Sequence, residues 1–329
     1  MKFKIDSFVL AVIIVVGLAY LFPQPGRDDS PVPLDAIGSL GISLIFFFYG
    51  LKLAREKVIS GIKNWKLHVL VQCSTFVLFP LVILLVHPFI HTQSALTIWL
   101  AFLFLGALPS TVSSSVVMVS IAKGNVPAAI FNASISGLIG IAITPLWMGL
   151  FLTQSSADFD LSEIYFKLTV EILGPVLLGL LLQRRLGKYA QQYSSQLSLF
   201  DKSVILLIIY KSFAESFDKH VFNSVQLHDL IYITVAALLL FYFVYGVTGY
   251  LARRFGFTRE DQITAQFCGT KKSLVHGTVF SKILFQNSAA TGIMLLPLML
   301  FHAMQIFIIS VIASKLGSDT PAHDKTTQP

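Results

Sequence analysis

The chain has 329 residues, of which 55% are hydrophobic and only 12% are charged, and apolar runs recur along its whole length. This composition excludes an ordinary soluble domain and predicts an all-α polytopic membrane protein that lies in the lipid bilayer. The net charge of +7 would suggest a nucleic-acid partner in a soluble protein. Most of these charges fall in short loops, so we expect them to set the topology and expect no nucleic-acid partner.

Ten membrane spans are predicted. The first, Phe8–Phe22, follows Lys2 and Lys4 like the apolar part of a signal peptide, but no small-residue cleavage site follows it, so we expect an uncleaved helix. The other spans are predicted at Leu34–Leu53, Leu67–Phe89, Ala95–Ala122, Pro127–Leu152, Glu163–Leu182, Asp201–Phe217, Asp229–Ala252, Asp261–Phe285 and Ala289–Ala313.

The spans form two sets of five at an offset of 162 residues, which takes Asn125 before the fifth span to Asn287 before the tenth. This match predicts a repeat over residues 5–152, a second over residues 163–314, and a polar tail, residues 315–329, that is typical of disorder. An accidental match of evenly spaced helices is the alternative. Because five is odd, the second repeat would be inverted, an architecture common in secondary transporters.

Loop charges predict the orientation. With the N-terminus inside, 17 Lys and Arg residues lie in inner loops and tails, whereas the outer loops hold only Arg27 and Lys219. Positive charge concentrates on the cytoplasmic side of membrane proteins. We therefore expect a cell membrane protein, in the inner or plasma membrane, with both termini cytoplasmic.

The stretch Phe267–Phe285 places two lysines, Lys271 and Lys272, in an apolar span. If the span began only at Ser273, its helix would cover about 20 Å of a hydrocarbon core about 30 Å thick. The lysines therefore fall inside the membrane, where charged side chains usually face a bundle interior or a cavity that serves transport. An interfacial or purely structural lysine pair is the alternative.

The same offset pairs this stretch with Leu105–Lys123, in which Pro109 removes a backbone hydrogen bond and is followed by a run of serine and threonine hydroxyls. Polar, interrupted spans in corresponding repeat positions indicate a substrate site. Helix packing through small residues is the alternative for the hydroxyl run. The candidate substrate- or ion-binding residues are Ser110, Thr111, Ser113, Ser114, Ser115, Thr270, Lys271, Lys272, Ser273, Thr75, Asn132 and His276.

Other polar residues in the predicted spans are interpreted separately. Lys211 and Glu215 are four apart and are predicted to pair with each other, whereas Glu171 and His302 stand alone in their spans and either line the pathway or are structural. No Walker loop, G-x-S-x-G motif or zinc-type His/Glu cluster occurs, so we expect no enzyme, no cofactor and no metal centre.

Three motifs resemble those of the bile acid:sodium symporter superfamily: T-F-V-L-F-P (Thr75–Pro80), L-P-S-T…A-K-G-N-V (Leu108–Val126) and F-C-G-T-K-K-S-L (Phe267–Leu274). The last resembles the subgroup that contains sodium/bile acid cotransporter 7 and its bacterial relatives. The similarity covers nearly the whole chain. It implies ten helices in two inverted repeats, a core domain whose fourth and ninth helices break and cross, and a panel domain of the first, second, sixth and seventh helices.

This chain departs from the pattern of the sodium-coupled members. The resemblance implies a carboxylate where this chain has Phe267, Gln-Asn where it has Lys271-Lys272, and a glutamine where it has Thr75. The family's Ser-Asn at the fourth-helix break is matched only in part, by Ser114 and Ser115. These departures remove oxygen ligands and add positive charge. We therefore expect no Na⁺ at the two sodium sites of those members, and a lysine ammonium in place of a bound cation.

The resemblance also assigns different roles to the two lysines. Lys271 takes the glutamine position and is expected to face the crossing. Because successive helical residues point about 100° apart, Lys272 is expected to meet Glu215 or another carboxylate. A desolvated lysine that loses its proton would couple transport to pH, so both H⁺ and Na⁺ stay open as coupling ions.

These observations predict a secondary transporter, in the manner of a symporter, that moves a small, anionic organic solute by alternating access. The rival hypothesis is a non-transporting membrane sensor or scaffold that binds partners through its cytoplasmic Lys52–Lys66 loop. Thermal stabilisation by a substrate, abolished by lysine substitution, would favour transport. The oligomeric state stays open.

Overall fold

The computed structural model describes residues 7–27, 30–52, 64–111, 113–152, 161–220, 226–285 and 291–318, and all regular secondary structure in this part of the chain is helical. The helices are α1 (Ser7–Leu21), α2 (Leu34–Lys52), α4 (Trp65–Cys73), α5 (Phe79–Leu84), α6 (Gln93–Ala107), α7 (Ser113–Ile121), α8 (Val126–Leu152), α9 (Leu161–Leu168), α10 (Gly174–Gln192), α11 (Ser194–Asp218), α12 (Leu227–Arg254), α13 (Arg259–Thr270), α14 (Leu274–Leu284) and α15 (Thr291–Ser318). Short 3-10 turns (Gln24–Gly26, His87–Phe89) and π turns (Ser74–Leu78, Thr169–Leu173) complete the elements.

Helical structure occupies every stretch predicted as a span. Six continuous helical segments of the described chain are long and apolar enough to cross a membrane: Leu34–Lys52, Trp65–Phe89, Val126–Leu152, Ser162–Gln192, His228–Arg254 and Thr291–Ser318. The chain is therefore built as a multi-pass membrane protein. The inverted repeat remains a prediction, and residues 319–329 of the predicted tail lie outside the described residues.

The fourth and ninth predicted spans each consist of two helices, and both interruptions expected from the sequence are present. α6 ends at Ala107, and Leu108 has an extended backbone (φ −72°, ψ 150°). This is the conformation to which a residue before proline is confined, here by Pro109. α13 ends at Thr270, and Lys271 is likewise extended (φ −83°, ψ 144°) before α14 begins.

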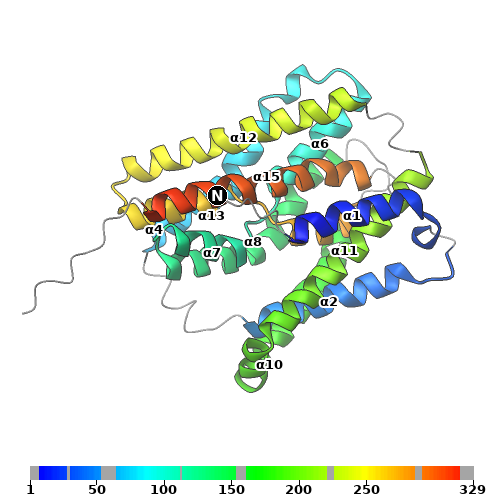
Figure 1. The fold of residues 1–329 in the computed structure, drawn as a ribbon, viewed down its shortest axis with the longest axis horizontal. Helices are drawn as coiled ribbons and strands as arrows, with labels where there is room; N and C mark the ends of the chain where they lie inside the picture. The colour runs from blue at the N-terminus through cyan, green and yellow to red at the C-terminus, as the bar shows by residue number, and fades with distance from the viewer. Residues whose placement is uncertain are drawn as a thin grey trace, which may run out of the picture.

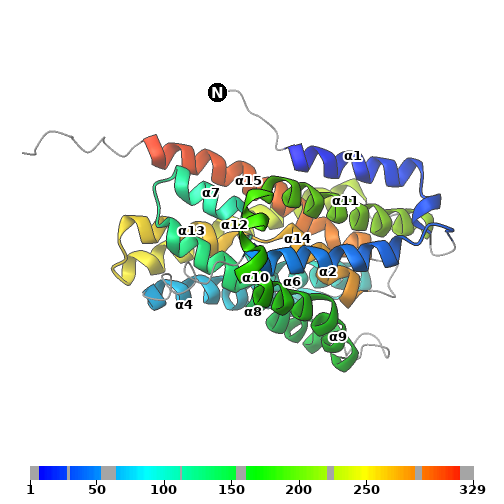
Figure 2. The same ribbon diagram turned by 90° about the horizontal axis from the view of Figure 1, so that it is seen from below.

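Helices α1, α2, α10 and α11 pack against one another, and α2 pairs with α10 most closely (Figures 1 and 2). Small residues make this possible: a Cβ on Gly179 would lie 2.2 Å from the backbone oxygen of Phe47, and one on Gly50 would lie 2.3 Å from that of Val176. These four helices are the ones that the resemblance assigns to a panel domain. The domain division itself remains a prediction.

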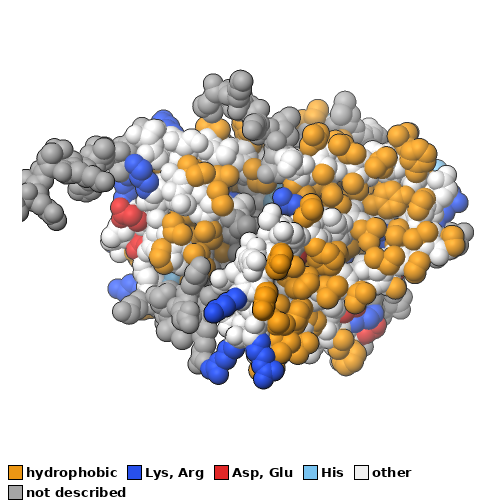
Figure 3. Space-filling view, turned by 60° about the horizontal axis from the view of Figure 1, so that its bottom comes forward, with side chains coloured by type: hydrophobic (Ala, Val, Ile, Leu, Met, Phe, Trp, Pro, Cys, Tyr) orange, Lys and Arg blue, Asp and Glu red, His pale blue; other side chains and the backbone are white. Residues whose placement is uncertain are grey.

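Large apolar side chains cover much of the surface. Leu181 of α10 and Leu239 of α12 are 78% and 67% exposed, and Figure 3 shows hydrophobic side chains over a large part of one face. A soluble monomer rarely exposes so much contiguous apolar area. In a multi-pass membrane protein, lipid chains cover such a surface.

We predict that Gly179→Ala destabilises the protein by about 1–3 kcal/mol, because the added methyl group overpacks the contact between α2 and α10. Thermal unfolding of the detergent-purified protein measures the effect. Gly246→Ala in α12 is the matched control, since its Cβ meets nothing within 4 Å and alanine favours the helix. Equal unfolding temperatures for the two variants would contradict the packing argument.

Candidate functional site

The two helix interruptions lie in direct contact. The Ser273 backbone N–H donates to the Pro109 carbonyl at 2.9 Å, and the Ser110 hydroxyl donates to the Cys268 carbonyl at 2.7 Å. We call the two extended segments, residues 108–111 and 271–273, the crossing. Their closeness confirms the expectation from the sequence offset and brings backbone polar groups together inside an apolar bundle.

Pro80 frees two carbonyl groups beside the crossing. Proline has no N–H to donate, and the backbone before it forms the π turn Ser74–Leu78. The carbonyls of Thr75 and Phe76 therefore lack their usual helical partners and need other donors. The Trp147 indole N–H supplies the Phe76 carbonyl at 2.8 Å.

The end of α6 frees further carbonyls. The last carbonyls of a helix have no intrahelical donor, and they carry partial negative charge. The hydroxyl of Thr144 donates to the Ala107 carbonyl at 2.8 Å. The carbonyls of Gly106 and Leu108 on either side are left for another donor.

The Lys272 ammonium fills the remaining positions. Its Nζ donates to the carbonyl oxygens of Thr75 at 2.7 Å, Gly106 at 2.6 Å and Leu108 at 2.9 Å, and it lies 4.1 Å from the ring centroid of Phe79. We call these three carbonyls the carbonyl cage. Three donors and three acceptors match, and the aromatic face adds a cation–π contact.

This arrangement explains why a fully buried ammonium is tolerated. Lys272 is 0% exposed, and removing such an ion from water costs several kcal/mol. Each hydrogen bond to a charged group returns about 1.5–3 kcal/mol. Three such bonds are comparable with the cost, and they also satisfy backbone acceptors that would otherwise stay unpaired.

The expectation that Lys272 meets a carboxylate was wrong. In the described part of the chain its ammonium donates its hydrogen bonds to backbone oxygens, and the Glu215 carboxylate instead pairs with Lys219 at 2.6 Å. The carbonyl oxygens at the end of α6 and before Pro80 already carry the partial negative charge that binds the ammonium, so no acidic side chain is needed.

Gln305 of α15 holds the backbone of the same residue. Its side chain accepts from Lys272 N at 2.7 Å and donates to Lys272 O at 2.7 Å, as a neighbouring β-strand would. Sequence reasoning missed this residue. A signal was present, since Gln305 is a fully buried amide in an apolar span, three residues after His302.

Lys271 points to the hydroxyl cluster at the start of α7. Its Nζ donates to Ser114 Oγ at 2.8 Å, and the Thr111 hydroxyl bonds to those of Ser114 at 2.9 Å and Ser115 at 2.8 Å. Lys271 is fully buried, and no carboxylate in the described part of the chain pairs with it. A positive charge therefore lies at the positive end of a helix, where anions are favoured.

The other candidate residues make mostly local hydrogen bonds. The hydroxyls of Thr75 and Thr270 donate within their own helices, to Val71 O and Gln266 O. Asn132 accepts from Gln72 at 3.2 Å, and His276 Nδ1 lies 2.9 Å from the Ser273 hydroxyl. Ser113 begins α7, and its side chain lies outside the described residues.

Comparison with known proteins supplies the family. The model of the SBF-like CPA transporter family matches residues 6–318, almost the whole chain. The chain belongs to this family. Membership confirms the resemblance to the bile acid:sodium symporter superfamily and makes the protein a membrane transporter by family.

Similar proteins occur in bacteria and vertebrates. An uncharacterized protein, PA2026, of Pseudomonas aeruginosa is 38% identical and covers 95% of this chain and 93% of its own. The putative symporter YfeH of Escherichia coli is 36% identical over 96% of this chain and 94% of its own. Sodium/bile acid cotransporter 7-A of Xenopus laevis is 30% identical over 96% and 93%.

We predict that Lys272→Ala lowers the free energy of unfolding by about 3 kcal/mol, because the carbonyl cage loses its donors. Propylammonium chloride matches the deleted atoms and is expected to restore part of the unfolding temperature. Tetramethylammonium, which has no N–H group, is expected to restore nothing. Thermal unfolding of the purified variant measures both effects.

Lys271→Ala is the matched control, since its ammonium has one side-chain acceptor, Ser114, in place of three carbonyls. We expect a smaller loss of stability and no effect of propylammonium. A Lys272→Ala variant that is as stable as the wild type, or that responds equally to both ammonium ions, would refute the cage.

Proposed function

We propose that this chain is a secondary active transporter that moves a small organic anion by alternating access, without Na⁺ at the crossing. Family membership establishes a membrane transporter, and the solute, the mechanism and the coupling ion are our proposals. Location in the inner or plasma membrane with cytoplasmic termini belongs to the same proposal and is supported by the 17 inner against two outer basic residues.

The occupied carbonyl cage is the observation that carries the proposal. Carbonyl oxygens at helix ends are typical ligands for coupling cations in transporters with discontinuous helices. Here the three oxygens already bind the Lys272 ammonium at 2.6–2.9 Å. A free Na⁺ would compete for the same oxygens and would be repelled by the fixed charge, so Na⁺ binding in this cage is unfavourable.

Lys271 is our candidate for the solute contact. Within the described residues its ammonium has one hydroxyl partner, at the amino end of α7, and an anionic group would complement both the charge and the helix dipole. A lysine can also release its proton to become a neutral amine. Proton binding and anion binding at Lys271 would then favour each other, which makes H⁺ the proposed coupling ion.

The inverted repeat is part of the proposal. The interruption at Leu108–Pro109 and the one at Lys271 lie at the offset of 162 residues that relates the two sets of spans. Two broken helices that meet inside the bundle suit a solute site alternately open to either side.

The relatives support ion-coupled transport of a small organic solute in general, because their names describe a putative symporter and sodium/bile acid cotransporters. We extend neither sodium nor bile acid to this chain, since its cage is filled by its own lysine. Family membership does not favour a sensor or scaffold.

We predict that small organic anions raise the unfolding temperature of the purified protein equally in Na⁺ and in K⁺ buffers. Lys271→Met is expected to reduce the apparent affinity for the best stabilising anion by about tenfold or more, because a charge-assisted contact is lost. Uptake of that anion into proteoliposomes should respond to a pH gradient and not to a Na⁺ gradient.

Lys188→Met is the control for loss of one positive charge, because this lysine is exposed on α10. Uptake that depends strictly on Na⁺ in the wild type, and that Lys271→Met leaves unchanged, would overturn both the proposed coupling and the role of Lys271.

A further inference from the structure

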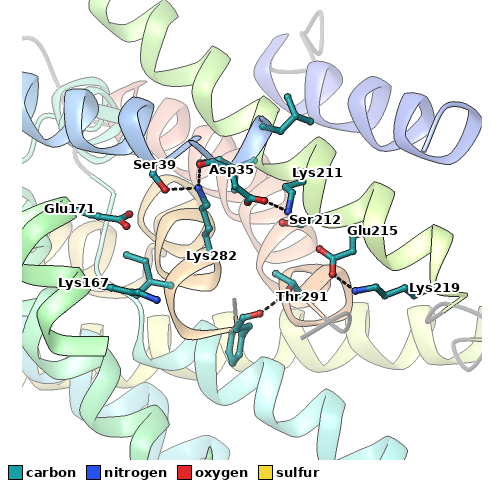
Figure 4. A pocket seen from close by; sticks show the side chains of 14 residues that line it. Asp35, Ser39, Lys167, Glu171, Lys211, Ser212, Glu215, Lys219, Lys282 and Thr291 are labelled. Carbon is teal, nitrogen blue, oxygen red and sulfur yellow. Dashed lines mark hydrogen bonds and ion pairs between the residues drawn. The ribbon is translucent and has the colours of Figure 1, made fainter. Parts of the chain in front are cut away.

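A second polar site lies away from the crossing, in a cavity of about 600 Å³. Its walls come from α2, α9 and the π turn after it, α11, α14 and the start of α15 (Figure 4). The volume is in the range of small-molecule sites. Seven charged side chains line it: Lys167, Lys211, Lys219, Lys282, Asp35, Glu171 and Glu215.

Most of these charges neutralise one another. Lys211 pairs with the Asp35 carboxylate, and Lys219 pairs with Glu215 at 2.6 Å. Lys167 pairs with a carboxylate outside the cavity at 2.8 Å. Lys211 and Glu215, which were predicted to pair with each other, thus each have another partner. The other two charged residues of the lining are Lys282 and Glu171, which carry opposite charges.

The positive one is Lys282 of α14. Its Nζ donates to the backbone carbonyl of Asp35 at 2.6 Å and to the Ser39 hydroxyl at 2.8 Å, both of which are uncharged groups. The Asp35 carboxylate that acts on Lys282 is already bound by Lys211. An ammonium with three N–H donors and two neutral acceptors keeps one donor available for a ligand.

The negative one is Glu171, in the π turn Thr169–Leu173. Glu171 lines the cavity together with Lys282, and Figure 4 shows its carboxylate directed towards that side of the cavity, with no dashed line to it. Within the described residues it has no hydrogen-bond or ion-pair partner. A half-buried carboxylate of this kind gains from a cationic ligand.

We propose that this cavity binds a small zwitterionic solute, with its anionic group at Lys282 and its cationic group at Glu171. A simple anion would satisfy Lys282 and be repelled by Glu171, and a simple cation would do the reverse. A molecule that carries both charges complements both walls. The inference goes beyond the proposed transport, because binding here requires neither movement across the membrane nor a particular coupling ion.

A matched series of probes tests the charge requirement. ε-Aminocaproate and γ-aminobutyrate carry both charges, caproate carries only the anion, and hexylammonium carries only the cation. Binding to the purified full-length protein is measured by calorimetry and by thermal shift at neutral pH. We expect at least one of the two amino acids to bind about tenfold more tightly than either singly charged probe.

Glu171→Gln is expected to lower the affinity for the amino acid by about tenfold and to leave caproate unchanged or tighter. Glu260→Gln, which removes an exposed carboxylate of α13 that does not line the cavity, should change neither. Lys282→Met should abolish binding of both probes. If that variant does not fold, the two glutamine variants still decide the question.

Caproate that binds the wild type as tightly as ε-aminocaproate would overturn the proposal in favour of an anion site. Failure of every probe to bind, or equal effects of Glu171→Gln and Glu260→Gln, would also overturn it. None of these outcomes bears on the crossing, where Lys271→Met is the informative variant.

Discussion

An ammonium held by backbone carbonyls is the interaction on which the centre of this structure depends. Two prolines create the need for it: Pro80 leaves the Thr75 carbonyl unpaired, and Pro109 ends α6 so that Gly106 and Leu108 face the same point. In an apolar bundle such groups are costly unless a donor reaches them. Lys272 is that donor, so breaks in two helices and one charged side chain stabilise one another.

Hydropathy predicted the positions of the helices well, but it predicted their ends less accurately. The sixth predicted span stops at Leu182, whereas α10 continues to Gln192, and α11 begins at Ser194 instead of Asp201. Hydropathy marks the part of a helix that contacts lipid, but a helix once formed extends through polar residues that favour it. The π turns gave no sequence signal beyond the prolines that follow them.

The position of the crossing could be predicted from the sequence, but only some of its contacts could. Pro109 and the two lysines located it, because proline chemistry and the cost of buried charge are properties of single residues. The partners of Lys272 were not predictable, since backbone oxygens belong to every residue and leave no mark in the sequence. Gln305 was visible in the sequence as an amide in an apolar span, but its contacts were not predictable for the same reason, because it binds the backbone of Lys272.

Backbone ligands have a consequence for how ion use can change in this family. Side-chain replacement at positions 75, 106 or 108 does not remove an oxygen from the cage, so the site persists while the sequence around it varies. The resemblance places asparagine where this chain has Lys272, and the codons for lysine and asparagine differ by a single base. One nucleotide change therefore separates Lys272 from an asparagine that would leave the three carbonyls without the ammonium.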